Sequence, residues 1–383
     1  MPATAQAPIS DRAKVDDFGS ISTPKILELM LRAEDHVSDL IFSPGRPPQI
    51  ETHGKLAGVR LLSHHPLTAG DTRRIASDLI GSNKAAVTML REQGSCDISY
   101  GLPGLARFRV NIFIQRGSCA VIMRVIPGTI PTLGALGLPP QLRNIANLRD
   151  GIVLVTGLRG SGKSSTLAAI LDHINQEKDC HIITIEDPIE FLHNHKRATV
   201  HQRELHSDTP SAALAMRAAL RQASKVIMLG EIHDRETIEM ALQAAETGQL
   251  VLSSMNTVDA AGTVEAMIGA FAPTDHARIR ERFAKTFRYI ISQRLIPIAN
   301  GARRVPGVEI VTSSPETRRC ISGIENLREN LLRAIKVGAP EGMQHFDGEI
   351  EKLVRSGTVE LEAALAHATD PQELARQVSR PVD

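Results

Sequence analysis

The chain has 383 residues, of which 42% are hydrophobic and 23% charged, so it can bury the cores of two or three domains and is not a disordered protein. Lys and Arg number 44 against 43 Asp and Glu, which leaves a net charge of +1 and no positive excess to drive nonspecific binding to nucleic acid or anionic membranes. Aromatic residues make up 3% of the chain, with no Trp, which argues against a surface for stacking bases.

The cysteines and the N-terminal segment indicate where the protein works. The four cysteines are scattered without a metal-binding spacing, a pattern typical of buried thiols in a reducing compartment. Residues 1–22 carry charges and lack the apolar core of a signal peptide, so we expect a disordered tail there. No apolar run approaches the ~18 residues that a membrane-spanning helix needs. We therefore expect a cytoplasmic protein.

Residues 23–127 mix helical and strand-like patterns. A helix is predicted from Thr23, because Pro24 suits a first helical turn, and further helix is predicted over residues 71–91 with a break at Gly81. Strand-like runs cover residues 39–43, 107–114 and 120–126. The sequence thus predicts an α+β domain over residues 23–127, and the Pro- and Gly-rich residues 128–140 predict a linker.

Residues 141–383 begin with a regular alternation of strand and helix. The predicted strands are residues 151–156, 181–185, 226–229 and 250–253, and the predicted helices are residues 163–175, 211–221 and 235–247. This alternation indicates an α/β domain with a parallel sheet, whose ligands bind at the carboxyl ends of the strands. Beyond Pro273 the sequence predicts mostly helix, apart from a strand over residues 305–311.

The segment GLRGSGKS, from Gly157 to Ser164, matches the pattern G-x-x-x-x-G-K-[ST] without a mismatch. A buried strand precedes it and a helix follows, so its glycines can turn backbone N–H groups and the helix N-terminus toward phosphates. Lys163 is expected to contact the β- and γ-phosphates, and Ser164 to ligate Mg²⁺. The predicted nucleotide-binding residues of this segment are Gly157, Gly160, Ser161, Gly162, Lys163, Ser164 and Ser165.

Two acidic segments follow neighbouring predicted strands. Glu186 and Asp187 come directly after one strand, and Glu231 comes after another. Hydrolysis of a nucleoside triphosphate needs one anion to orient water and another to support the metal ion. An acid at a strand end can also be a helix cap or a plain surface residue, but two at the same sheet edge favour the catalytic interpretation.

The residues then resemble a known family, the secretion and type IV pilus ATPases. ITIEDPIEF (residues 183–191) is similar to the family's Asp box, and LGEIHDRET (residues 229–237) to its Walker B segment. ARFRVNIF (residues 106–113), FRYIISQRLI (residues 287–296) and GMQHFD (residues 342–347) match as well, with the likeness strongest to the pilus-retraction ATPases of the PilT/PilU kind.

This resemblance implies a PAS-like N-terminal domain joined to a RecA-like P-loop domain that binds and hydrolyses ATP with Mg²⁺. It implies a homo-hexameric ring at the cytoplasmic face of the inner membrane, acting on a platform protein and alongside a paralogous retraction ATPase, and no nucleic-acid partner. Family positions assign phosphate contacts to Arg107, Arg109 and Arg124. They assign water activation to Glu186 and the Mg²⁺ network to Glu231, although these two roles are interchangeable at this point.

The chain also departs from the family pattern. Asn256 stands where the family's L-H-T segment has histidine, and Asn cannot carry a proton or a charge. His233 replaces the arginine of the Walker B segment, so a permanent charge becomes a titratable one. Two alternatives to a retraction motor therefore stay open: an ATP-responsive ring subunit with weak turnover beside an active paralogue, and a RecA-like nucleic-acid motor. Neutral net charge and few aromatics argue against the latter.

Overall fold

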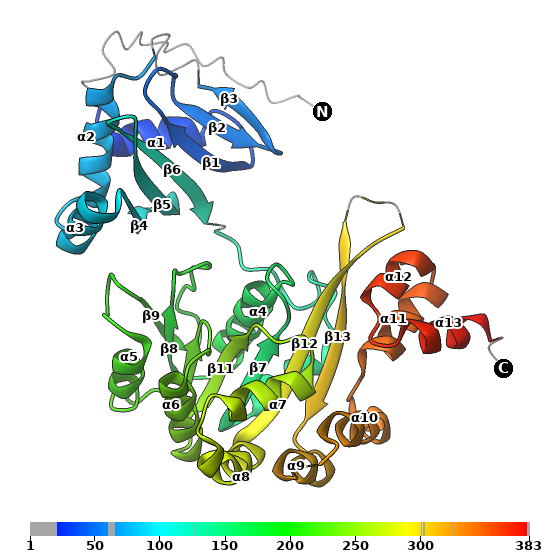
Figure 1. Cartoon of the computed structure of the whole chain (residues 1–383). Helices are drawn as coiled ribbons and strands as arrows, with labels where there is room; N and C mark the ends of the chain where they lie inside the picture. The colour runs from blue at the N-terminus through cyan, green and yellow to red at the C-terminus, as the bar shows by residue number, and fades with distance from the viewer. Residues whose placement is uncertain are drawn as a thin grey trace, which may run out of the picture. The chain divides into compact units, whose positions relative to one another are not determined.

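The computed structural model describes residues 21–59, 66–126, 128–299, 301, 303–323 and 325–380. The chain forms two compact units, Met1–Gly128 and Thr129–Asp383 (Figure 1). The predicted tail, residues 1–22, falls almost entirely outside the described residues. Of the predicted linker, Leu133 and Leu138 are buried in the core of the second unit.

The first unit is a six-stranded antiparallel sheet in the order β3-β2-β1-β6-β5-β4. Its core contains Leu40, Phe108 and Met123 from the sheet and Ile26 and Ile75 from the helices. The predicted break at Gly81 is confirmed, because this glycine has φ +54° and separates two helices. The elements are α1 Thr23–Leu31, β1 Val37–Phe42, β2 Gln49–Thr52, β3 Lys55–Gly58, α2 Ala69–Ile80, α3 Lys84–Gln93, β4 Ser95–Leu102, β5 Ala106–Gln115 and β6 Ser118–Ile126.

The second unit is a seven-stranded sheet in the order β13-β12-β7-β11-β10-β8-β9, in which only β13 runs antiparallel to its neighbour. Every residue of β7 is buried, as its apolar sequence predicts. The strands are β7 Gly151–Thr156, β8 His181–Glu186, β9 Thr199–Glu204, β10 Val226–Leu229, β11 Leu250–Met255, β12 Phe287–Pro297 and β13 Arg304–Thr312.

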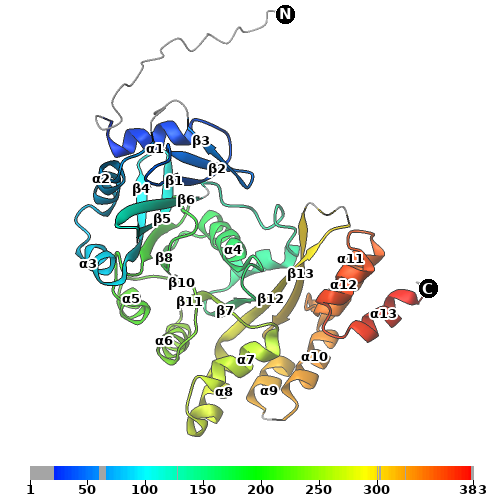
Figure 2. The same cartoon turned by 45° about the horizontal axis from the view of Figure 1, so that its top comes forward.

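Helices pack against this sheet, and two large apolar clusters form its core. The last three helices lie together beyond β13 in both views (Figures 1 and 2). The expected architecture, a RecA-like P-loop domain with a smaller PAS-like α+β domain, is confirmed in both units. The helices are α4 Lys163–Glu177, α5 Ala212–Ala219, α6 Arg235–Glu246, α7 Ala260–Gly269, α8 His276–Thr286, α9 Pro315–Ser322, α10 Leu327–Val337, α11 Phe346–Arg355, α12 Leu361–His367 and α13 Pro371–Ser379.

The prediction of mostly helix beyond Pro273 is wrong for residues 287–297. These residues form β12, which pairs in parallel with β7 and antiparallel with β13. Phe287, Ile290 and Ile291 have the spacing of a helix face, which is why the local pattern misleads. Pairing with β7 makes these residues a strand, because it completes the backbone hydrogen bonding of that buried strand.

Glu309 on β13 is an ionisable group buried inside this core. Its side chain is 8% exposed, and burial raises its pKa to about 7. The folded chain therefore keeps a proton on Glu309 between the ordinary carboxyl pKa and about pH 7, where the unfolded chain has lost it. Stability from this group is full at low pH and falls as pH rises through that window.

The variant E309Q is expected to be more stable than the natural chain at alkaline pH, because Gln stays neutral at every pH. Its advantage in unfolding free energy should grow by about 3 kcal/mol between about pH 4.5 and about pH 8. Thermal unfolding at several pH values measures this, with the exposed Glu341→Gln as the control. An advantage that does not change with pH would contradict the burial of a titrating Glu309.

Candidate nucleotide-binding site

The loop after β7 has a backbone that only glycine can supply. Gly157 has φ +149°, and a Cβ there would lie 2.4 Å from Ser161 Oγ and 2.5 Å from the Gln293 carbonyl oxygen. Gly160 and Gly162 have φ +81° and +91°, so the chain turns sharply before α4 begins at Lys163. No side chain caps the start of α4. Its free N–H groups and dipole therefore form a cradle suited to phosphate oxygens.

Buried polar atoms around this loop lack partners. The buried atoms are Ser161 Oγ, Thr156 Oγ1 and Gln293 Oε1. None of them has a hydrogen-bond partner in the described part of the chain. A buried polar atom without a hydrogen bond lowers the stability of the fold, unless a ligand or water supplies the missing partner. Ser161 belongs to the glycine-rich loop itself, so a bound phosphate is the kind of group that fits this place.

Lys163 is the cation of the site. Its Nζ donates to the carbonyl oxygens of Gly157 at 2.9 Å and Leu158 at 3.2 Å, and to Asn256 Oδ1 at 2.8 Å. Asn256 Nδ2 in turn donates to Glu231 Oε1 at 2.5 Å. Burial lowers the pKa of Lys163, while the charges of Glu231 and Glu190 act in the opposite direction. Asn256 therefore joins the predicted lysine and the predicted Walker B acid in one network.

A second network starts from Ser164. Its Oγ donates to Glu190 Oε1 at 3.0 Å, so the hydroxyl expected to ligate Mg²⁺ lies beside an exposed carboxylate. Ser165 lies half-buried in the first turn of α4. Hydroxyl and carboxylate oxygens are ligands that Mg²⁺ favours, so Ser164, Glu190 and Glu231 fit a metal–phosphate group bound at this loop. The metal would supply charge neutralisation on the phosphates.

Glu186 has a different environment. Its side chain is 7% exposed, and its Oε1 accepts from Thr184 Oγ1 at 2.5 Å and from Gln202 Nε2 at 3.0 Å. Burial raises its pKa. Within the described ranges these bonds tie Glu186 to β8 and β9, and none reaches the residues of the glycine-rich loop. By contrast, Glu190 accepts a hydrogen bond from Ser164 of the loop, and Glu231 is joined to Lys163 through Asn256.

Gln202 on β9 fixes residues 186–193, the segment that carries Glu186 and Glu190. Besides Glu186, its Nε2 donates to the Phe191 carbonyl oxygen at 2.9 Å, and its Oε1 accepts from His193 N at 2.8 Å. Glu190 lies between these anchor points. Sequence reasoning missed Glu190 and Gln202 as site residues. The signal for Glu190 was available, because it follows Glu186 in the same acidic motif, whereas nothing local marks Gln202.

The three predicted phosphate arginines lie in the first unit. Arg107 and Arg109 are on β5, and Arg109 stands directly opposite Arg124 on β6. Strand alternation places all three on the face opposite to the core residues Phe108 and Met123. Arg124 Nε donates to Asp39 Oδ1 at 3.0 Å, and Arg109 Nε lies 4.0 Å from Asp97 Oδ1.

The fold and the loop define a P-loop nucleoside triphosphatase. A family model described as "Type II/IV secretion system protein" matches residues 104–367. The chain therefore belongs to the type II/IV secretion ATPase family, among the PilT-like pilus retraction ATPases, and the expected resemblance is confirmed. It is a P-loop ATPase.

Individual relatives cover nearly the whole chain. PilT of Pseudomonas aeruginosa, a type IV pilus retraction ATPase, is 38% identical over 90% of this chain and 98% of its own. PilU of the same organism, a type IV pilus ATPase, is 34% identical over 91% of this chain and 89% of its own. A crystal structure of the pilus retraction motor PilT with bound ADP superposes with a TM-score of 0.82, at 36% identity, over 93% of this chain and 99% of that one.

Proposed function

We propose that this chain is a Mg²⁺-dependent ATPase motor that powers retraction of a type IV pilus as a homo-hexameric ring. The observation that carries the proposal is the pair of networks at the P-loop, Lys163–Asn256–Glu231 and Ser164–Glu190. Together they supply the cation, the metal-ligating hydroxyl and the exposed carboxylates that phosphoryl transfer requires. The names of the PilT and twitching-motility relatives support pilus retraction as the work performed.

Catalysis would be positioning and electrostatics. Backbone N–H groups of the glycine-rich loop and Lys163 hold the β- and γ-phosphates and oppose the charge that develops on them. Ser164 and Glu231 would hold the metal ion. Glu190 is the best candidate for orienting the attacking water, because it is exposed and lies beside Ser164. We assign Glu186 to positioning this segment through Gln202. Phosphate contacts by Arg107, Arg109 and Arg124 stay part of the proposal.

The proposed partners are other copies of the chain, a platform protein of the inner membrane and a paralogous retraction ATPase, since both PilT and PilU type relatives are known. Work at the cytoplasmic face of the inner membrane would follow from these partners. Among the described residues, the helices are all too short or too polar to cross a bilayer. Negative-stain imaging with and without ATP tests the ring directly, and monomers under both conditions would refute it.

An accessory subunit with weak turnover is the alternative, and Asn256 and His233 are what favour it. His233 is exposed, with Nε2 3.5 Å from Asp234 Oδ2, and within the described chain no hydrogen bond or ion pair joins it to the P-loop residues. Asn256, by contrast, already connects Lys163 to Glu231 through both atoms of its amide. The geometry therefore favours a competent ATPase despite both replacements.

The double variant Asn256→His plus His233→Arg distinguishes an ATPase motor from an accessory subunit with weak turnover. We expect the natural chain to hydrolyse ATP when Mg²⁺ is present, and the double variant to change kcat by less than about tenfold, because the amide already bridges the two charged groups. Steady-state phosphate release measures both proteins. A larger rise in kcat in the double variant, from a natural chain that hardly turns over, would favour the accessory subunit.

A further inference from the structure

Residues 230–234 join β10 to α6 and carry Glu231 on backbone that belongs to neither a helix nor a strand. Such a segment lacks the repeating hydrogen bonds of a helix or a sheet, so individual contacts fix where its side chains lie. Glu231 itself is exposed, and burial does not hold its side chain in place. Its position therefore depends on the hydrogen bonds that it and its two neighbours make.

Ser254, near the end of β11, contacts the backbone on both sides of Glu231. Its Oγ donates to the Gly230 carbonyl oxygen at 2.7 Å, and its own carbonyl oxygen accepts from Ile232 N at 2.9 Å. Ser254 is 6% exposed, so these hydrogen bonds lie where water competes little for their atoms. One residue thus holds the peptide groups before and after the acid, and it holds the first of them through its side chain.

The same part of the chain also holds the carboxylate of Glu231. Asn256 directly follows β11, two residues after Ser254, and its Nδ2 donates to Glu231 Oε1 at 2.5 Å. The end of β11 and the residue after it therefore fix Glu231 at three points. Two of these points are on the backbone of its neighbours, and the third is on its side chain.

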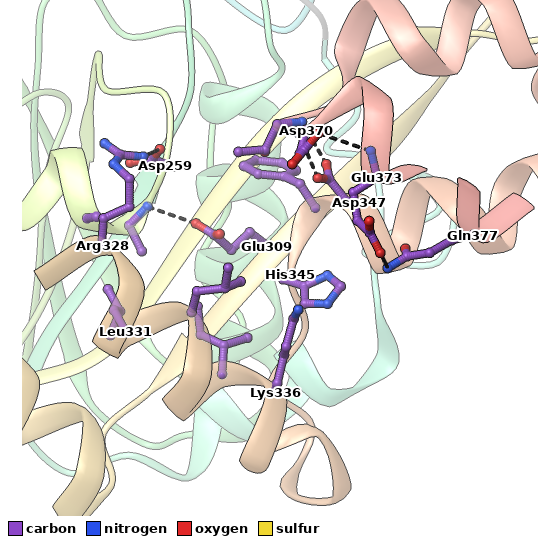
Figure 3. A pocket seen from close by; sticks show the side chains of 16 residues that line it. Asp259, Glu309, Arg328, Leu331, Lys336, His345, Asp347, Asp370, Glu373 and Gln377 are labelled. Atoms are coloured by element: carbon purple, nitrogen blue, oxygen red, sulfur yellow. Dashed lines mark hydrogen bonds and ion pairs between the residues drawn. The ribbon is translucent and has the colours of Figure 1, made fainter. Parts of the chain in front are cut away.

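The loop that follows β11 is fixed at its far end, where α7 begins. Asp259 caps α7 and pairs with Arg328, and Glu309 Oε1 accepts from Ala260 N at 2.8 Å. Figure 3 shows Asp259 beside Arg328 and the hydrogen bond to Glu309, at the pocket between α7, β13 and α10. Because the chain after β11 is held on both sides, the end of this strand is a rigid support for the acid next to it.

We propose that Ser254 is a positioning residue for ATP hydrolysis, which acts through Glu231 by fixing the peptide groups on either side of it. The inference rests on the proposed role of Glu231 in the Mg²⁺ network. Loss of the Ser254 hydroxyl removes a donor from the Gly230 carbonyl oxygen, and the peptide group that joins Gly230 to Glu231 gains freedom to rotate. A displacement of ~1 Å in such a group can cost about 100-fold in rate.

Ser253 offers a matched control in the same strand. Its Oγ donates to the Leu229 carbonyl oxygen at 2.7 Å, which is the same kind of bond made to the residue just before Gly230. Leu229 is still part of β10, where it stands in register with Ser253 and with Ile185 on β8. Removing the Ser253 hydroxyl therefore costs a similar hydrogen bond, but the sheet still holds the backbone there.

The experiment compares Ser254→Ala, Ser253→Ala and Glu231→Gln in the full-length chain. Calorimetry with the non-hydrolysable analogue AMP-PNP, in Mg²⁺ and in EDTA, measures how much the metal strengthens nucleotide binding. We expect Ser254→Ala to reduce this strengthening about threefold or more, with little change of affinity in EDTA, and to lower kcat about tenfold or more. Ser253→Ala should change either quantity by less than about twofold. Thermal unfolding verifies that both serine variants are folded.

A double variant shows whether Ser254 acts through Glu231. Adding Ser254→Ala to Glu231→Gln should slow single-turnover hydrolysis by less than about twofold further, because the acid that the serine positions is already gone. A full additional loss in the double variant, or equal behaviour of Ser254→Ala and Ser253→Ala, would overturn the inference and leave the proposed function intact. If Glu231→Gln itself changed neither the effect of Mg²⁺ nor kcat, the proposed role of Glu231 would fail, and this inference with it.

Discussion

Replacing Lys163 by alanine is expected to reduce ATP turnover below detection. Lys163 Nζ is the cation at the glycine-rich loop, where it contacts two loop carbonyl oxygens and Asn256. A bound triphosphate would draw Nζ to its own oxygens, which bear more charge than those carbonyls. Without the lysine, nothing else in the two P-loop networks supplies a positive side chain near the γ-phosphate, so a large part of the charge compensation in the transition state is lost. Steady-state phosphate release and ATP binding by calorimetry measure both consequences.

The control for Lys163→Ala is Lys285→Ala. Lys285 is an exposed lysine on α8 whose ion pair is with Glu281, within its own helix, so its loss should leave kcat and KM for ATP unchanged. Both variants should unfold at temperatures close to that of the natural chain, because Lys163 forms no part of the apolar core. Sustained hydrolysis by Lys163→Ala would defeat the assignment of the glycine-rich loop as the catalytic phosphate site.

The parts of the site that depend on local chain geometry were predictable from sequence. Gly157, Gly160 and Gly162 have positive φ values, and the helix begins at Lys163, as the motif requires. The strand preceding them is buried along its whole length. Each of these properties is set by neighbouring residues, since backbone strain and strand hydrophobicity act over a few positions.

The directions of the acidic side chains were not predictable in this way. Glu186 and Glu190 belong to one motif at one strand end, yet Glu186 is buried against Thr184 and Gln202 while Glu190 reaches Ser164. The difference comes from β9, which supplies Gln202 from a strand that the sequence did not reveal. Side-chain direction at a sheet edge depends on which strands neighbour it, and that is a tertiary property.

The same reason explains the missed strand at residues 287–297. Its apolar residues fit a helix face as well as a strand, and pairing with β7 selects the strand. The consequence reaches the site, because Gln293 on this strand places its carbonyl oxygen and an unpaired Oε1 beside the glycine-rich loop. Tertiary context thus decided part of the wall of the nucleotide site.

The variants Glu190→Gln and Glu186→Gln should have unequal effects. Glu190→Gln removes the exposed negative charge beside Ser164, so we expect kcat to fall about 100-fold with a smaller change in ATP affinity. Glu186→Gln keeps an oxygen that can accept from Thr184 and Gln202. Burial raises the pKa of Glu186, so the neutral amide is tolerated there, and we expect kcat to fall less than about tenfold.

Single-turnover hydrolysis with both variants, alongside nucleotide binding, separates chemistry from affinity. Gln202→Leu serves as the matched test of positioning, because it removes the anchors of the segment while leaving both acids in place. It should lower kcat through Glu190 and have little further effect once Glu190 is already Gln, since two changes on one path are not additive. If Glu186→Gln instead proved the more damaging of the two acid replacements, the roles of these carboxylates would be the reverse, and Glu190 would only help to bind the metal–nucleotide.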